Sequence, residues 1–367
     1  MLPVLGLLLA MAAWRPAPAL AIPLFASQFG VSCAKCHSVV PHLNAFGAAF
    51  LAYGYRIPGV KPDRAFPISG KTNLVLSSEN QGDGPNGEGL PKAIVDEVEL
   101  FTAGAIGSRA SYLVEQYAVD GGSHGSTRDA WVNDRLNPWT ANIPLYAQAG
   151  SFTLPLPVDP ETFRDTYQGY TLYEQTAGAN PFNFFDSKIG LRIGAGNPLR
   201  GTNVQLFAGP GHDRQSGLSS TGTDAMEVVQ HNMGPFAVGL YRYAGRRPVN
   251  GSFDRFERTG YSLVFDQWGR LSLENVLQTG WDSECGIVAG IGCSSSGGFS
   301  QLRYQFNRRL FASARYEGTN ARNAFTGDGV LLLGFAPSER SRFTIEDAIS
   351  RVPQTAHTMN IQFTIAY

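Results

Sequence analysis

The chain has little charge and no excess of either sign. Of its 367 residues, 16% are Asp, Glu, Lys or Arg, and the formal net charge is −1. Ordinary soluble domains carry roughly 25% of such residues. A chain this close to neutral lacks the positive field that attracts nucleic acid, so the sequence gives no electrostatic case for that class of partner.

Long hydrophobic runs are missing after the N-terminus. Residues 1–14 form an apolar stretch too short to span a bilayer, and Ala19-Leu20-Ala21 supplies a small-x-small cleavage pattern. We predict a signal peptide over residues 1–21, with an uncleaved N-terminal anchor as the alternative. No later stretch approaches the roughly 18 consecutive apolar residues of a transmembrane helix. The mean hydropathy of −0.12 also excludes a helical membrane protein.

The chain contains only four cysteines, and two of them lie in Cys33-Ala34-Lys35-Cys36-His37. C-x-x-C-H is the attachment motif of c-type haem. Each cysteine can form a thioether to a haem vinyl group, and His37 is placed to bind the iron as the proximal ligand. An exported chain is where such a motif functions, since this haem is attached outside the cytoplasm. The alternative interpretation is a disulfide or an unrelated cysteine pair beside a histidine.

The other two cysteines, Cys285 and Cys293, bracket a short Gly-rich segment. In an exported protein this arrangement predicts a disulfide that closes a loop.

The residues after the haem motif predict one short helix. Leu43, Phe46, Phe50 and Tyr53 recur at the spacing of one helix face. We expect Phe46 and Phe50 to pack against the haem. The segment from Ile22 to about Pro58 is under 40 residues, which is too small to fold alone without a staple or a larger partner.

The distal iron ligand is left open by the sequence. His42 is one candidate, although on a continuous helix its Cα would lie only about 8 Å from that of His37, too close for ligands on opposite haem faces. Pro41 could break such a helix. Other candidate ligands lie farther along the chain, namely His124, His212, Met226, His231, Met233 and His357. The remaining alternative is iron whose sixth position is open or occupied by water.

From about Phe66 onward the chain shows segments of eight to twelve residues with period-2 alternation, separated by Gly, Asn, Asp, Pro and Ser clusters. In the last segment, odd positions from His357 to Tyr367 are mostly apolar and even positions are mostly polar. We expect Met359 to face lipid. Charges in the middle of several strands suit a barrel with a wet interior. The fold class predicted is all-β, a transmembrane antiparallel barrel of about 16 strands, with the N-terminal helical haem segment as a plug.

This interpretation divides the chain into a signal peptide (1–21), a monohaem cytochrome c segment (22–62) and a porin-like barrel (63–367). An exported β-sandwich is the alternative to the barrel. The stretch from Pro155 to Asn183 fits a strand poorly and is predicted to be a long loop with a short helix, either inside the lumen or outside the barrel. No catalytic triad, P-loop or dinucleotide motif is present. Four loop carboxylates could gather Fe(II), namely Asp213, Asp224, Asp282 and Glu284.

The combination of a haem motif near the mature N-terminus with a barrel ending in an aromatic residue resembles the fused monohaem cytochrome–porins of the outer membrane, an iron-oxidase-like family. The resemblance is carried by a segment of about thirty residues and rests on Phe25-Ala26, Gln28, Gly30, Cys33, Cys36, His37, Pro41, Leu43, Phe46-Gly47, Phe50 and Gly54-Tyr55. The chain departs from the family pattern at Ser27 and Leu51, where basic residues are common, and its barrel looks shorter.

The resemblance implies electron transfer across the outer membrane of a Gram-negative bacterium through one haem c. The donor would be extracellular Fe(II) or another external donor, and the acceptor a periplasmic c-type cytochrome or other carrier. An Fe(II)-oxidising oxidoreductase activity follows only if Fe(II) is the donor. One alternative is a transport porin whose haem segment is a structural or gating plug. Another is a non-membrane exported haem sensor or binding module.

Overall fold

The structure is a computed structural model that describes most of the chain after residue 23. The described residues are 24–57, 60, 68–78, 92–138, 141–177, 180–197, 200–211, 223–249, 251–266, 270–284, 291–321, 324–351 and 355–367. The predicted signal peptide lies outside them, and so does the predicted boundary between residues 62 and 63.

The N-terminal segment folds into short helices around a two-stranded hairpin. Its elements are α2 (Leu24–Phe29), the 3-10 helix η1 (Cys33–Lys35), β1 (His37–Val39), β2 (His42–Leu43) and α3 (Ala45–Ala52). We call residues 24–57 the plug. Among the residues that the structure describes, no helix is both long enough and apolar enough to cross a membrane.

The rest of the chain forms one closed antiparallel barrel, in which β19 pairs with β3 to complete the ring. Sixteen long strands make up the wall, and the two-residue β6 (Ser123–His124) adds to one edge of the β5–β7 hairpin. Sixteen is the number that the sequence predicts. The wall strands are β3 (Ile68–Ser77), β4 (Lys92–Ile106), β5 (Ala110–Asp120), β7 (Thr127–Arg135), β8 (Leu145–Phe152), β9 (Lys188–Gly196), β10 (Gly201–Gly209), β11 (Asp224–Met233), β12 (Phe236–Val249), β13 (Ser252–Asp266), β14 (Leu271–Asp282), β15 (Cys293–Gln305), β16 (Leu310–Ala321), β17 (Ala324–Ser338), β18 (Ser341–Arg351) and β19 (Thr355–Ala366).

Period-2 alternation sorts the strand residues between the two faces of the wall, because successive side chains of a strand point in opposite directions. In β19, Asn360, Gln362 and Thr364 are buried inside, whereas Met359 is 55% exposed outside. The same division holds in β14, where Glu274 faces inward and Leu277 outward. An apolar outer face with a polar interior is the pattern of a transmembrane barrel and the reverse of a soluble sandwich.

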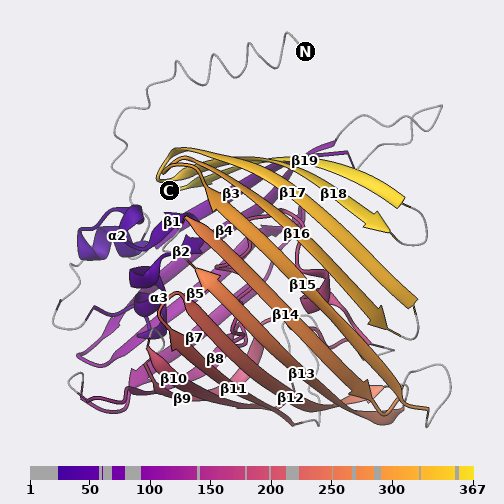
Figure 1. Cartoon of the computed structure of the whole chain (residues 1–367). Coiled ribbons are helices and arrows are strands. Elements are labelled where there is room, and N and C mark those ends of the chain that lie inside the picture. Colours follow the sequence, from indigo (N-terminus) through magenta and orange to yellow (C-terminus); the bar gives the residue numbers. More distant parts are fainter. Residues whose placement is uncertain are drawn as a thin grey trace.

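The two ends of the barrel differ in the length of their connections. At one end the strands are joined by short turns, such as 107–109 between β4 and β5 and 339–340 between β17 and β18. At the other end lie longer connections, including 78–91, 153–187, 210–223 and 283–292. Figure 1 shows the plug at the same end as the C-terminus, which is the short-turn end.

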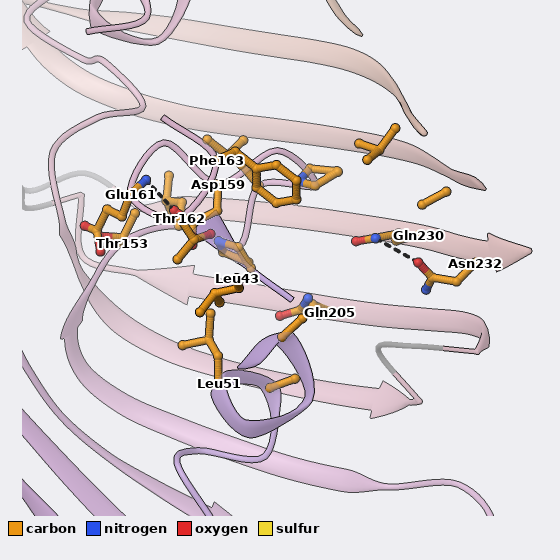
Figure 2. Close-up of a pocket in the computed structure, with 18 of the residues that line it drawn as sticks. Leu43, Leu51, Thr153, Asp159, Glu161, Thr162, Phe163, Gln205, Gln230 and Asn232 are labelled. Carbon is orange, nitrogen blue, oxygen red and sulfur yellow. Dashed lines mark hydrogen bonds between the residues drawn. The ribbon is translucent and has the colours of Figure 1, made fainter. Parts of the chain in front are cut away.

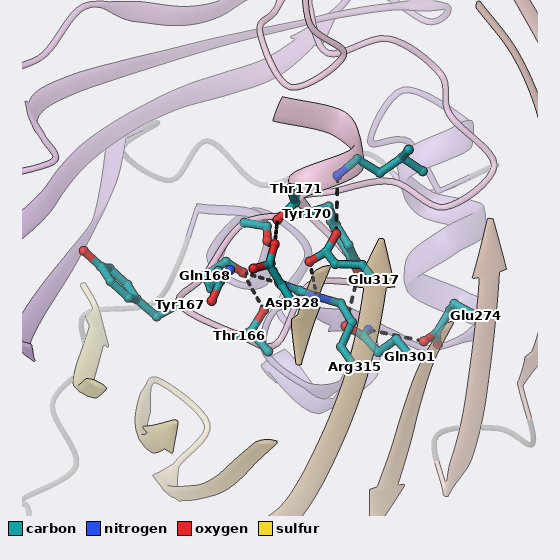
Figure 3. Close-up of polar contacts among 12 residues, drawn as sticks. Thr166, Tyr167, Gln168, Tyr170, Thr171, Glu274, Gln301, Arg315, Glu317 and Asp328 are labelled. Carbon is teal, nitrogen blue, oxygen red and sulfur yellow. Dashed lines mark hydrogen bonds and ion pairs between the residues drawn. The ribbon is translucent and has the colours of Figure 1, made fainter. Parts of the chain in front are cut away.

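The long connection between β8 and β9 folds into the lumen and carries α4 (Thr171–Glu174). This result decides between the two placements that the sequence left open. Tyr170 and Tyr173 are completely buried, and Arg315 of the wall donates hydrogen bonds to Thr166 Oγ1 (2.7 Å) and to the Gln168 carbonyl (2.9 Å). Figure 3 shows how Arg315 and neighbouring acids of the wall hold this lumen loop.

Candidate haem site

Residues 33–37 form a tight turn at the surface of the plug, which we call the haem turn. Cys33 and Cys36 are unpaired thiols of intermediate exposure; Cys33 is the first residue of η1 and Cys36 follows its last residue. The backbone N–H of Cys33 donates to Glu339 Oε2 (3.0 Å) in the β17–β18 turn. Both thiols are therefore available for thioether bonds, on a turn that is tied to the barrel.

The ring of His37 is oriented by its own chain. Its Nδ1 lies 3.0 Å from the Pro41 carbonyl oxygen, which can only accept, so Nδ1 carries the proton and donates. The tautomer set by this bond leaves the lone pair on Nε2. A histidine that binds a metal commonly donates its other N–H to such a carbonyl. The arrangement fits the proximal ligand predicted from the sequence.

Burial controls the protonation of the haem turn. It lowers the pKa of His37, which favours the neutral imidazole that a metal requires, while the hydrogen bond to Pro41 opposes the shift. Burial and the neighbouring Cys33 raise the pKa of the Cys36 thiol to about 11. Reactive dithiol motifs have lowered thiol pKa values, so this pair does not fit a redox-active disulfide.

Asn44 and Gly47 fasten the haem turn to α3. The Asn44 side chain caps the helix by accepting from Gly47 N–H (3.0 Å), and its Nδ2 donates to the Lys35 carbonyl (3.2 Å). The Asn44 N–H also donates to the Cys36 carbonyl (2.8 Å). A methyl group at Gly47 would collide with that same carbonyl. Only glycine permits this close approach of the helix to the haem turn.

The predicted haem-packing residues Phe46 and Phe50 lie in one aromatic cluster. Their rings are stacked with centroids 6.5 Å apart, and Phe50 also contacts Phe25 and Phe29 edge-on. Phe50 is only 6% exposed, so it is the centre of the small core of the plug. The structure brings these two residues together, and their contact with haem stays a prediction.

His42 points into the barrel. It is 1% exposed, packs edge-on against Phe163 of the lumen loop (5.5 Å between centroids), and its Nε2 lies 3.8 Å from Asp266 Oδ2. Neither ring nitrogen has a hydrogen-bond partner among the described residues. His42 belongs to a β-hairpin and not to a helix, and it is adjacent to Leu43, the cross-strand partner of His37, so the two histidines are still close together. Its role as distal ligand remains a prediction.

The more distant candidates are less well placed. His124, His231, Met233 and His357 are exposed at the barrel surface, and Met226 is buried in an apolar cluster with Phe182 and Phe207. His212 lies outside the described residues. Of the described candidates, His42 is therefore the one that belongs to the plug and is buried.

The plug is docked to the wall by several hydrogen bonds. Ser111 Oγ donates to the Gly54 carbonyl (2.5 Å), Gln28 Nε2 to the Ala103 carbonyl (2.8 Å), and Gln305 Nε2 to the Ser38 carbonyl (3.2 Å). Apolar contacts add to these, with Val39 packed on Phe311 and Leu332. Tyr55 stacks on Trp131 at 5.7 Å. A segment this small thus extends its own core with residues of the barrel.

A cavity of about 450 Å³ lies between α3 and the lumen loop. Leu43 and Leu51 line the plug side, and Asp159, Glu161 and Phe163 line the opposite side (Figure 2). The wall contributes amides and arginines, including Gln205, Gln230 and Arg192. The barrel side of the cavity therefore mixes these polar side chains with apolar ones such as Trp131, Phe152 and Val264.

The carboxylates considered for Fe(II) are not assembled into a site. Asp224 pairs with Arg247 (2.7 Å) and Asp282 with Arg258 (2.8 Å), and both aspartates are buried. Asp213 lies outside the described residues. Across the described part of the chain, no group of three or more His, Cys, Asp or Glu residues could hold a metal ion.

Cys293 at the start of β15 is disulfide-bonded. Cys285 lies outside the described residues, so the predicted Cys285–Cys293 pairing stays a prediction.

Comparison with solved structures identifies the architecture. An anion-selective porin from Comamonas acidovorans superposes with a TM-score of 0.61 at 11% identity, covering 82% of this chain and 98% of the porin. OmpF of Salmonella typhi, in a complex with daunomycin, gives 0.58 at 10% identity, covering 82% and 97%. A loop-deletion variant of OmpT, an outer-membrane protein of Vibrio cholerae, gives 0.56 at 12%, covering 82% and 98%.

The barrel has the fold of an outer-membrane porin. At these identities the likeness concerns the fold, and the haem turn has to be judged on its own residues. No protein-family model and no curated protein matches the chain.

Sequence reasoning missed three contributors to the site. Asn44 precedes an apolar run and is a favoured N-cap residue, so its position could have been read as a helix start. Glu339 and Ser111 reach the plug from turns and strands far along the chain, and no local pattern announces such contacts.

Proposed function

We propose that this chain is an electron-transfer protein of the outer membrane that carries one c-type haem at the short-turn mouth of a porin-fold barrel. The observation that carries the proposal is the haem turn: two unpaired thiols beside a histidine whose Nδ1 is tied to the Pro41 carbonyl. Cys33 and Cys36 would hold the haem and His37 the iron. When bound, the haem supplies reversible one-electron chemistry, tuned by its ligands and burial.

The position of the haem turn gives the proposal a direction. Outer-membrane barrels have short periplasmic turns and longer extracellular loops, so the short-turn end corresponds to the periplasm. A periplasmic c-type cytochrome or other carrier could then approach the haem turn without entering the barrel. Extracellular Fe(II), or another external donor, would have to enter from the long-loop end, because one haem cannot bridge a hydrocarbon core of about 30 Å.

Spectroelectrochemistry of the full-length, detergent-purified protein tests this function. We expect a covalent haem spectrum, a reversible one-electron titration, and reduction on addition of Fe(II). The Cys33→Ala/Cys36→Ala variant is the control and should keep the barrel but lose the covalent haem. Exported wild-type protein without haem would overturn the proposal. Haem that dithionite reduces and Fe(II) does not would eliminate iron as the donor and leave electron transfer standing.

A transport porin with a structural or gating haem plug is the second candidate. The porin fold of the compared structures and the cavity beside α3 favour it. Single-channel conductance separates the two functions. Conductance that is the same in the wild type and in Cys33→Ala/Cys36→Ala, together with a haem that no donor reduces, would favour transport.

A further inference from the structure

The charge of the short-turn end stands out against the neutral chain. Among the described residues of the plug and the short turns, eight are Lys or Arg and one, Glu339, is acidic. The adjoining strand ends contain two acidic and two basic residues, so their charges cancel. These residues are Asp134, Asp266, Arg135 and Arg342. Since the whole chain has a net charge of −1, the rest of it is correspondingly acidic. The positive charge is therefore concentrated at one mouth.

Six arginines of the short turns make up this positive ring, which we call the basic rim. Five of them are exposed and Arg340 is half-exposed. Among the described residues, Arg109 lies 3.9 Å from Asp134, and Arg340 follows Glu339 in its turn. The members of the basic rim are Arg109, Arg200, Arg270, Arg308, Arg309 and Arg340.

Two turns of the basic rim lie beside the haem turn. Glu339, next to Arg340, accepts the Cys33 N–H at 3.0 Å. Gln305, which precedes the turn of Arg308 and Arg309, donates to Ser38 one residue after His37. On the plug itself, Lys35 is exposed within the haem turn and lies over the Phe46 ring at 4.6 Å. The described plug contains no acidic residue.

We propose that the basic rim is the docking face for a soluble electron carrier whose own contact surface is acidic. This inference deepens the proposed function, on which it rests, by naming the kind of partner. Facing charges of opposite sign raise association rates by roughly 10- to 1,000-fold, and they do so most at low ionic strength. The same positive mouth repels Fe²⁺, which is consistent with a cationic donor approaching from the opposite end.

A matched pair of probes tests the charge of the partner. One probe is a lysine-rich soluble cytochrome c, and the other is the same protein with its lysines succinylated, which reverses its charge and keeps its haem. The full-length protein is reduced with dithionite, freed of excess, and mixed with each oxidised probe in a stopped-flow instrument. We expect the succinylated probe to be reduced at least about tenfold faster in low salt, and the difference to vanish as salt shortens the Debye length to a few ångströms.

A matched pair of variants tests the place of docking. Arg308→Glu/Arg309→Glu reverses two exposed charges beside the haem turn. Arg246→Glu/Arg255→Glu reverses two exposed arginines that are cross-strand neighbours at the opposite end of the barrel. The first variant should lose most of the preference for the succinylated probe with an unchanged haem spectrum, and the second should keep it. Equal rates for both probes, or equal effects of both variants, would overturn the inference.

Absence of haem would overturn the proposed function without deciding whether the basic rim is a docking face. If the purified protein lacks haem, binding of the two probes measured by sedimentation still reports on the rim, and preference for the succinylated probe would support the docking face alone. Binding to vesicles of phosphatidylglycerol that depends on Arg308 and Arg309, without any preference between the probes, would overturn the inference and assign the rim to the membrane surface.

Discussion

Replacement of Gly47 by alanine sets two physical effects against each other. In an ordinary helix, Gly→Ala stabilises by about 1 kcal/mol. Here the added methyl group would overlap the Cys36 carbonyl oxygen and lie 2.8 Å from the carbonyl carbon and 2.9 Å from Leu43 Cδ2. Overpacking of this kind costs about 1–3 kcal/mol, and displacing the carbonyl weakens its bond from Asn44, worth about 1 kcal/mol. The net expectation is a loss of about 1–3 kcal/mol, located in the plug.

Hydrogen exchange of the α3 amides measures this loss directly, together with the fraction of purified protein that carries covalent haem. We expect faster exchange in α3 and less haem, while the circular dichroism and heat stability of the barrel stay unchanged. Ala49→Gly is the matched control, because it costs only helix propensity, about 1 kcal/mol. Exchange in Gly47→Ala that is equal to or slower than in the wild type would refute the steric argument.

Three further changes test the haem turn, the docking of the plug and the lumen loop. His37→Ala should keep haem through its thioethers but change the Soret band and shift the midpoint potential, since the proximal ligand is lost; an unchanged spectrum would contradict the assignment. Gly54→Ala places a methyl group against the Asn133 amide, at a residue whose φ is +63°. This variant should make residues 24–57 sensitive to protease without unfolding the barrel. Resistance equal to that of the wild type would argue against docking through Gly54. Asp165→Ala leaves Arg303 without its buried partner at 2.7 Å and should destabilise the lumen loop by about 3–5 kcal/mol, measured by urea unfolding; a loss under 1 kcal/mol would contradict a buried ion pair.

Period-2 alternation made the barrel predictable, because in a strand one residue step decides between lipid and lumen. The final strand shows this most clearly, with Met359 outside and Gln362 inside as expected. The same rule could not place the stretch from Pro155 to Asn183, which has no period. Its position depends on partners such as Arg315, which lies more than a hundred residues away in the chain. The alternation predicts that the Arg315 side chain points inward, but it does not predict which residues that side chain binds.

The haem turn was predictable as a motif, and its surroundings were not. C-x-x-C-H predicts Cys33, Cys36 and His37 as haem-binding residues from covalent chemistry alone, and their binding of haem stays a prediction. The hairpin that joins His37 to His42 was not anticipated; it replaces the expected helix but keeps the two residues close together, so the spacing objection to His42 still holds. The contacts that dock the plug join residues 57 to 306 positions apart, as with Ser111 to Gly54 and Cys33 to Glu339. Such pairs follow from closure of the barrel and have no local signature.

The location of the plug limits the size of any external donor. The lumen loop occupies part of the barrel interior, and among the described residues a cavity of about 450 Å³ lies between this loop and α3. A hydrated metal ion or a small organic reductant fits such a space, whereas a folded protein does not. Under the proposed function, a free ferrocene derivative added to intact cells should reduce the haem. The same ferrocene coupled to a large dextran should not reduce it. Equal reduction by both, in cells whose outer membrane is shown to be intact, would mean that electrons enter the protein by a route other than the lumen.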